Sequence, residues 1–426
     1  MLRRDLLKWG AASALIGCGR AAAQAPVTLE IQYSPPAFAQ FHDPIGEAFR
    51  AAHPHVRLQF RQGFPTYDDQ HLAVMRQALT GQLPDVYFTG FHLLDEAVVQ
   101  LTRRNQVVDL TPLMAAEGED WARRNYAPRI LALGQVGGRQ FGLAMNASSP
   151  IMYYNPDLVR RAGGDPESMP DSWNGVIGLA ARIKQQSSAV NGMAYDVHDW
   201  TDDWLWRGLV LQGGGRMLNE ARTAVAFGDA TGLNALRLAR RFVIEGGMQM
   251  IARQQSQQQF AAGGIGLFFS SPSGLQSIAR LVGDRFPMRT ARFPLDDKER
   301  GAVPTGGNAA MILTRSPEKQ RAAWDYLKFI TGPVGQRIAV EMTGYLPTNL
   351  IAAGPDHLGP VYDRNPNMRV VLTQIERSVP WEGYPGTNAV RIWRAQKDII
   401  TAVMRGEATP EAALPRMVEE SNALMR

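Results

Sequence analysis

The stretch that decides the fold class runs from residue 27 to residue 88. Val27-Thr28-Leu29-Glu30-Ile31-Gln32-Tyr33 and Val56-Arg57-Leu58-Gln59-Phe60 alternate apolar and polar residues, which predicts two strands. Helical patterns at 45–52 and 68–79 follow them, and Asp85-Val86-Tyr87-Phe88 predicts a short buried strand. Strands that alternate with helices across short links predict an α/β fold with a parallel sheet, in which ligands bind beyond the carboxyl ends of the strands.

The rest of the chain keeps this mixed character and contains no internal repeat. Residues 142–154 form an apolar, strand-like run that is interrupted by a polar insert at 146–150. Residues 264–269 predict another buried strand, which ends in Ser270-Ser271-Pro272-Ser273-Gly274. Periodic apolar positions and capping residues predict helices at 157–162, 172–186, 233–245, 318–330, 332–342 and 392–405.

Composition indicates a globular protein with two domains. The chain has 426 residues, 45% of them hydrophobic and 20% charged, and single cores stop growing near ~250–300 residues. The formal charge of +5 is dispersed along the chain, which argues against a nucleic-acid-binding surface. Cys18 is the single cysteine, so we expect a mature chain without disulfides, thiolate nucleophiles or cysteine-bound metal.

The first residues are typical of an export signal. Paired arginines at Arg3 and Arg4 precede a short apolar run and small residues at 21–23, which predicts a twin-arginine signal peptide over residues 1–23 and a periplasmic protein beginning at Gln24. An alternative remains open. Leu15-Ile16-Gly17-Cys18 is similar to a lipobox, which would leave Cys18 as a lipid-bearing first residue.

Motifs of common enzyme classes are missing, including the nucleophile elbow, the zinc-protease helix, the phosphate loop and the dinucleotide fingerprint. One polar cluster, His198 with Asp199, Asp202 and Asp203, has the residue types of a hard-cation site or a carboxylate pair. Its spacing suits a solvated helix start better. We therefore expect no catalysis, metal or cofactor, and keep an exported hydrolase that uses these aspartates as the alternative of another class.

Trp200, Trp204 and Trp206 are interleaved with that cluster. Indole faces beside hydrogen-bonding side chains suit polyols and sugars, whose C–H faces stack on the ring. The competing interpretation is ordinary core packing. We expect Trp200 and Trp204 to contact a ligand.

Several different short motifs are distributed over nearly the whole chain. They are the run 146–157 (NASSPIMYYNPD), Arg161-Ala162-Gly163, Pro170-Asp171-Ser172-Trp173, Gly306-Gly307, Thr343-Gly344-Tyr345-Leu346-Pro347-Thr348 and the tail 406–414. As a set, these motifs resemble the extracellular solute-binding proteins of ABC importers (family 1), in particular its glycerol-3-phosphate-binding and related sugar-binding members.

The resemblance implies a two-lobe, periplasmic-binding-protein-like fold (type II) with a ligand cleft and a hinge of several crossings. We expect crossings near Met145, Arg285 and Leu313. The first lobe would then comprise residues 24–144 plus 285–313, and the second lobe residues 145–284 plus 314–426.

The resemblance also implies a set of ligand-binding residues. Ser270 or Ser273 could replace Ser271, because Pro272 disturbs that motif. Phe91 stands where a carboxylate is expected to hold glycerol hydroxyls, and Trp393 stands near the place of a phosphate-binding arginine, with Arg391 and Arg394 alongside. The implied contacts are Tyr67, Phe91, Ser148, Trp200, Trp204, Ser271, Gly307, Tyr345, Arg391 and Trp393.

The sequence therefore predicts a monomeric periplasmic protein that delivers a solute to a membrane permease by hinge closure. A polyol phosphate, a glycerophosphodiester or a carbohydrate is expected as the solute, and a neutral sugar or oligosaccharide is the alternative within the class.

Overall fold

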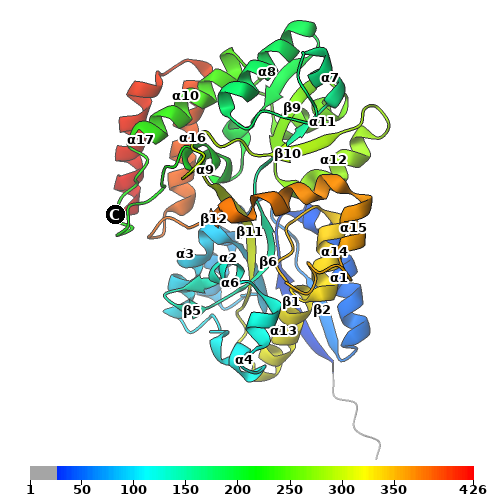
Figure 1. Cartoon of the computed structure of the whole chain (residues 1–426). Helices are drawn as coiled ribbons and strands as arrows, with labels where there is room; N and C mark the ends of the chain where they lie inside the picture. Colours follow the sequence, from blue (N-terminus) through cyan, green and yellow to red (C-terminus); the bar gives the residue numbers. More distant parts are fainter. Residues whose placement is uncertain (1–25) are drawn as a thin grey trace, which may run out of the picture.

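A computed structural model describes residues 26–426 and divides them into two lobes, one above the other in Figure 1. Each lobe is built on its own β-sheet. The predicted signal peptide (residues 1–23), the new N-terminus at Gln24 and the alternative lipid-bearing Cys18 lie outside the described residues.

The first lobe contains the sheet that the opening stretch predicts. Its strand order is β12-β11-β3-β1-β2, with β6 paired to β11. β1 runs parallel to β2 and β3, whereas β11 runs antiparallel to β3 and β6. The strands are β1 (Val27–Gln32), β2 (Val56–Phe60), β3 (Val86–Gly90), β6 (Leu143–Ser148), β11 (Val303–Ile312) and β12 (Ser378–Pro380).

Helices on both sides cover this sheet (Figure 1). Local chemistry fixes their ends: the Thr66 hydroxyl accepts the N–H of Asp69 at 3.0 Å where α2 begins, and Gly81 ends that helix with a φ of 73°. The elements are η1 (Pro36–Phe38), α1 (Ala39–Ala52), α2 (Tyr67–Thr80), α3 (Phe91–Thr102), α4 (Thr111–Ala116), α5 (Trp121–Asn125), α6 (Pro128–Ala132), the hairpin β4 (Gln135–Val136) and β5 (Arg139–Gln140), α13 (Pro317–Ile330) and α14 (Pro333–Met342).

The second lobe has a sheet of order β10-β7-β9-β8, in which β8 and β9 are parallel and the other pairs are antiparallel. Its strands are β7 (Ile151–Tyr154), β8 (Asn191–Ala194), β9 (Ile265–Ser270) and β10 (Arg289–Arg292). Its helices are α7 (Pro156–Arg161), α8 (Trp173–Gln186), η2 (Val197–Asp199), α9 (Trp204–Leu211), α10 (Ala230–Ile244), α11 (Arg253–Ala261), η3 (Pro272–Gly274), α12 (Leu275–Val282), α16 (Ala389–Arg405) and α17 (Pro410–Met425).

Three stretches of chain join the lobes. The apolar run at 142–154 breaks at Ser149-Pro150, where β6 of the first lobe gives way to β7 of the second, because proline has no N–H to continue a ladder. Residues 293–302 return the chain from β10 to β11. The third connection, residues 343–388, carries α15 (Gly359–Arg364) and η4 (Pro366–Arg377) across the middle of the molecule (Figure 1).

The division between lobes differs from the expected one at three places. β12 pairs with β11, so residues 378–380 lie in the first sheet although 314–426 was expected in the second lobe. α13 packs on β1 and α14 packs on α1, so residues 317–342 lie with the first lobe although the second was expected to begin at 314. β10 pairs with β7, so residues 289–292 lie with the second lobe although 285–313 was assigned to the first. Amphipathic helices after β11 can cover either sheet, and the sequence pattern alone does not say which.

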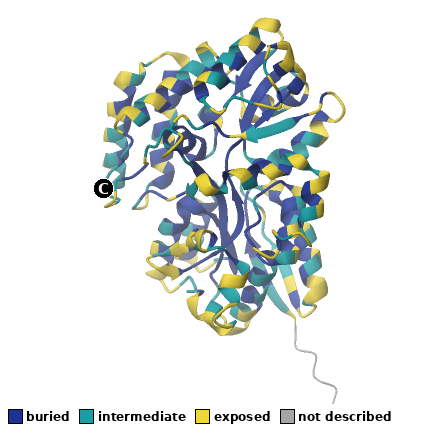
Figure 2. Ribbon diagram, viewed as in Figure 1, coloured by how far each residue is buried: buried dark blue, intermediate teal, exposed yellow. Residues whose placement is uncertain are grey.

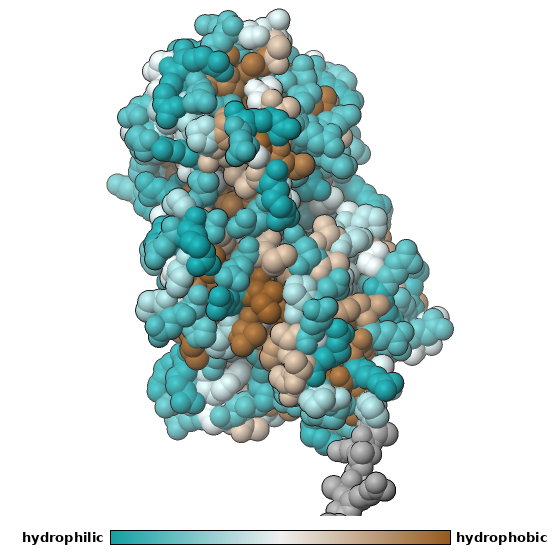
Figure 3. Space-filling model, turned by 90° about the vertical axis from the view of Figure 1, so that its right-hand side faces the viewer, coloured by the Kyte–Doolittle hydropathy of each residue, from teal (hydrophilic) through white to brown (hydrophobic). Residues whose placement is uncertain are grey.

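Burial follows the two sheets. β3, β6, β7, β9 and β11 are buried along their whole length, and exposed residues concentrate on the outer helix faces (Figure 2). On the face turned to the viewer in Figure 3, hydrophilic residues cover most of the upper lobe, and apolar residues gather lower down. No described helix is long and apolar enough to cross a membrane.

Candidate functional site

The facing edges of the two sheets bring together side chains that are far apart in the sequence. In the first lobe, α3 starts with Phe91 directly after β3, and α2 starts with Tyr67. Because β11 is antiparallel to β3, its residues 306–308 lie at this same edge, opposite Gly90 and the end of β6. Ser148 is the last residue of β6 and is buried.

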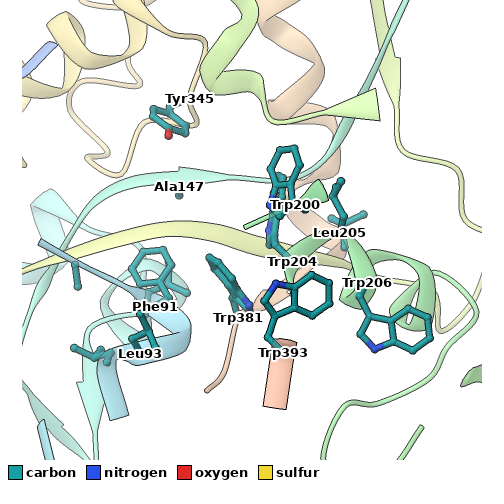
Figure 4. Close-up of a cluster of buried hydrophobic side chains, with 14 of the residues drawn as sticks. Phe91, Leu93, Ala147, Trp200, Trp204, Leu205, Trp206, Tyr345, Trp381 and Trp393 are labelled. Atoms are coloured by element: carbon teal, nitrogen blue, oxygen red, sulfur yellow. The ribbon is translucent and has the colours of Figure 1, made fainter. Parts of the chain in front are cut away.

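The second lobe contributes the segment that follows β8 and the one that follows β9. Trp200 and Trp204 come from the first segment, and their rings lie 5.8 Å apart at an angle of 30°. The Trp204 indole N–H reaches into the first lobe, where it donates to the Pro304 carbonyl at 3.1 Å. Figure 4 shows Trp381 and Trp393 below these two rings, with Phe91 and Tyr345 to their left. An aromatic cluster therefore lies where the lobes meet.

Polar groups of the first lobe surround the half-buried Tyr67. The Asn308 amide donates to the Tyr67 hydroxyl at 3.0 Å, and the Asn308 backbone N–H donates to the Asn146 side-chain oxygen, also at 3.0 Å. Gly307 has a φ of 132°, and a Cβ there would lie 2.2 Å from the Asn146 carbonyl oxygen. Gly307 thus shapes the site through its backbone, because only glycine fits this conformation and this close approach.

His92 connects charged groups of both lobes. Its Nε2 lies 3.1 Å from an Asp68 carboxylate oxygen, and its ring stacks on Trp381 with centroids 4.0 Å apart. Burial works against the protonated form, but the hydrogen bond and charge of Asp68, helped by Asp202 and Asp203, raise the pKa of His92.

Asp202 and Asp203 are buried in the second lobe at the start of α9. Burial, with Asp68 and Asp203 nearby, raises the pKa of Asp202 to about 6. The Asp203 carboxylate accepts from the Arg207 guanidinium at 2.7 Å and from the Trp381 indole N–H at 2.7 Å. Carboxylates therefore outnumber the buried cations of this cluster, which are His92 and Arg207.

The other predicted contacts are placed as follows. The Ser271 hydroxyl accepts the N–H of Ser273, and Tyr153 donates to the Ser271 carbonyl at 2.7 Å. Tyr345 is 4% exposed and lies on a segment that bridges to Ala147. Trp393 is buried beside the other tryptophans. The remaining residues of the prediction, Arg391 and Arg394, are exposed on α16.

The sequence patterns do not predict five further residues of this site: Asp68, His92, Asn146, Asn308 and Trp381. Asn146 and Asn308 adjoin the quoted motifs, so a search for polar residues at strand ends could have found them. Nothing in the sequence indicates that Trp381 lies between His92 and Asp203. Asp199, of the hydrolase alternative, is exposed and accepts the N–H of Arg253, away from the buried Asp202 and Asp203.

Two further features concern possible metal ligands and the position of a cavity. Among residues 26–426, no three histidine, cysteine or acidic side chains are grouped as metal ligands. A cavity of about 860 Å³ lies outside the aromatic cluster, between β10, the 166–171 loop and η4, and none of the predicted site residues lines it.

A family model and two relatives of known function all point to solute-binding proteins. The family described as bacterial extracellular solute-binding protein matches residues 33–337. The chain is 20% identical over 406 residues to the sn-glycerol-3-phosphate-binding periplasmic protein UgpB of Escherichia coli (strain K12), covering 90% of this chain and 89% of that protein. It is 22% identical over 326 residues to UgpB of Rhizobium meliloti (strain 1021), covering 74% and 75%.

Solved structures agree on the fold. UgpB from Mycobacterium tuberculosis in complex with glycerophosphocholine superposes with a TM-score of 0.81 at 18% identity, covering 94% of this chain and 98% of that one. The cyclic alpha-maltosyl-1,6-maltose binding protein from Arthrobacter globiformis gives 0.77 at 20% identity, covering 94% and 99%. These likenesses confirm the predicted two-lobe α/β fold of periplasmic binding proteins.

Proposed function

Because the chain belongs to the bacterial extracellular solute-binding proteins, the non-catalytic capture subunits of ABC importers, we propose that it binds a polyol or carbohydrate, free or phosphorylated, between its lobes. The observation that carries the proposal is the meeting of indole faces and polar side chains where the sheet edges of the two lobes face each other. Such a surface suits a hydroxylated ligand, whose C–H faces stack on the rings while its hydroxyls bind polar groups.

The buried carboxylates of the site favour a hydroxylated ligand over an anionic group at its centre. His92 lies against Asp68, Arg207 is paired with Asp203, and Asp202 adds a further carboxylate. An anionic group at the centre of this cluster would meet these carboxylates, whereas hydroxyl groups can donate to them. The centre of the site therefore favours the hydroxylated part of the ligand.

A phosphorylated polyol is a second candidate, because a free cation lies at the edge of the aromatic cluster. The Arg253 guanidinium stacks on Trp200 with its carbon 4.7 Å from the ring centroid. The side chain is exposed and forms no hydrogen bond or ion pair with residues 26–426. A stacked guanidinium keeps its N–H edge free for phosphate oxygens. Two relatives named above are sn-glycerol-3-phosphate-binding proteins.

We expect capture to follow closure of the lobes about the three connections. Contacts that cross between the lobes, such as the one from Trp204 to Pro304, would hold the closed form. The closed shape would then be presented to the permease.

A thermal-shift screen of the mature chain tests the ligand class. The probes are glycerol, sn-glycerol 3-phosphate, glycerophosphocholine, maltose and a maltooligosaccharide. A ligand at a thousand times its Kd adds about 4.1 kcal/mol, and each kcal/mol raises the Tm by roughly 2–4 °C in domains of this size. If no probe raises the Tm, the proposed ligand class is wrong.

The phosphate candidate has its own test in Arg253→Gln. We expect this change to weaken sn-glycerol 3-phosphate by roughly tenfold or more and to leave maltose unaffected, because a charge-assisted bond contributes about 1.5–3 kcal/mol. Arg391→Gln is the matched exposed control, and calorimetry gives both affinities. An effect of Arg391→Gln alone would move the anion to α16. If neither variant discriminates, the neutral-sugar alternative is left.

A further inference from the structure

Two buried asparagines face each other where β6 and β11 pair. Asn146 and Asn308 are register partners, and they are 1% and 0% exposed. The Asn308 backbone N–H donates to Asn146 Oδ1, which fixes the orientation of that amide. The Asn146 Nδ2 donor forms no hydrogen bond of good geometry among residues 26–426, although the Asn146 amide lies near enough to the Tyr67 hydroxyl to influence it.

The Asn308 side chain has the complementary deficit. Its Nδ2 donates to the Tyr67 hydroxyl at 3.0 Å, and its Oδ1 has no partner among the same residues. A buried polar group without a partner costs about 1–3 kcal/mol. A single group that both accepts and donates, such as a hydroxyl of a bound solute or a water molecule that the solute displaces, can satisfy this unpaired donor and this unpaired acceptor beside the half-buried Tyr67.

The chemistry of the two free atoms restricts that ligand. A hydroxyl accepts one hydrogen bond and donates another, so it can satisfy Nδ2 of Asn146 and Oδ1 of Asn308 at once. Phosphate and carbonyl oxygens only accept, and an ammonium only donates, so each of them would leave one asparagine atom unpaired.

A second hydroxyl group of the solute has a partner in Tyr67, next to the two asparagines. Because the Tyr67 oxygen accepts from Asn308, its own hydrogen is available to another oxygen atom. Gly307 makes the arrangement feasible, because a Cβ there would lie 2.6 Å from Asn146 Oδ1.

We propose that Asn146 and Asn308, with Tyr67, recognise a vicinal diol of the solute. This assignment rests on the proposed function and deepens it, because the diol becomes the required feature of the ligand and any phosphate a peripheral one.

Calorimetry with matched compounds tests the assignment. Glycerol, sn-glycerol 3-phosphate, glycerophosphocholine and maltose are each compared with an analogue lacking one hydroxyl of a vicinal pair: 1,3-propanediol, its monophosphate, its phosphocholine ester, and 2- and 3-deoxymaltose. We expect wild type to bind the diol at least about tenfold more tightly, since one lost hydrogen bond and its unpaired partner cost about that factor.

Asn146→Asp is the decisive variant. It keeps an oxygen for the Asn308 N–H but replaces the free donor by an acceptor, so the preference for the diol should fall to roughly twofold or less. Asn191→Asp is the control. It makes the same change at a buried asparagine of the second lobe, the first residue of β8, and should keep the wild-type preference.

The outcomes separate the two proposals. If wild type binds the diol and the deoxy compound equally, the diol assignment is overturned and the proposed function still stands. This measurement does not depend on the folding of any variant. An Asn146→Asp protein that discriminates like wild type would overturn it as well. If wild type binds none of the probes, both proposals fail together.

Discussion

His42 is a titratable side chain enclosed by the first lobe. It is 0% exposed, stacks on Tyr33 at 4.1 Å, and neither ring nitrogen has a partner among the described residues. Burial lowers the pKa of His42 to about 3. An unfolded chain binds a proton at this residue near pH 6.5, so the folded state loses stability as the pH falls from about 6.5 towards 3.

The variant His42→Phe should remove that loss while keeping an aromatic ring against Tyr33. Between pH 7.5 and pH 5, wild type should lose roughly 2 kcal/mol more than the variant, at about 1.4 kcal/mol for each pH unit below 6.5. Urea unfolding at the two pH values measures the difference. His55→Gln changes an exposed histidine of the same lobe and serves as control. Equal pH dependence in wild type and His42→Phe would contradict the burial argument.

Individual residues also mark how far the sequence could predict the site. The family resemblance implies Tyr67 and Ser148, which lie at the start of α2 and at the end of β6. Trp381 could not be predicted, since its partners Asp203 and His92 are 178 and 289 residues away along the chain. Gly307 was identified by resemblance, and its φ of 132° supplies a physical reason for glycine there.

At the scale of elements, β2 spans Val56–Phe60 as the alternation predicts, and α8 begins after the predicted cap Ser172. α1 begins at Ala39 rather than near Ile45, because Pro44 fits within its early turns. Periodicity reports which face of an element is buried, but it does not report which sheet the element covers. For that reason α13 and α14 were assigned to the second lobe.

The start of α9 gives an element-scale prediction. Asp203 joins Arg207 of that helix to Trp381 of the segment that follows β12, and the ion pair is 3% exposed on both sides. Removing one partner of a buried pair leaves an uncompensated charge and costs about 3–5 kcal/mol. Asp203→Ala should destabilise the protein by that amount in urea unfolding.

The double change Asp203→Leu with Arg207→Met should be milder, because no buried charge remains without a partner. Arg216→Met, which breaks the exposed pair with Glu220, is the control and should change stability by less than about 1 kcal/mol. An Asp203→Ala protein as stable as wild type would show that Arg207 finds another partner.

For the whole molecule, the two-lobe arrangement predicts a change of shape on binding. A ligand found in the thermal-shift screen should reduce the radius of gyration in solution scattering, while the mass remains that of a monomer. The described contacts between lobes, such as Trp204 with Pro304, would be more populated in the bound state. An unchanged scattering profile at saturating ligand would contradict hinge closure.

The position of β11 constrains how the chain is made. This strand lies between β3 and β6 in the first sheet, yet it begins at Val303, long after β3 ends at Gly90. On the ribosome, β3 therefore emerges with one edge unpaired, and it stays so while the four strands of the second lobe, β7 to β10, are synthesised. An exposed strand edge is a template for aggregation. We therefore expect the sheet of the first lobe to be completed only after translation has passed residue 312.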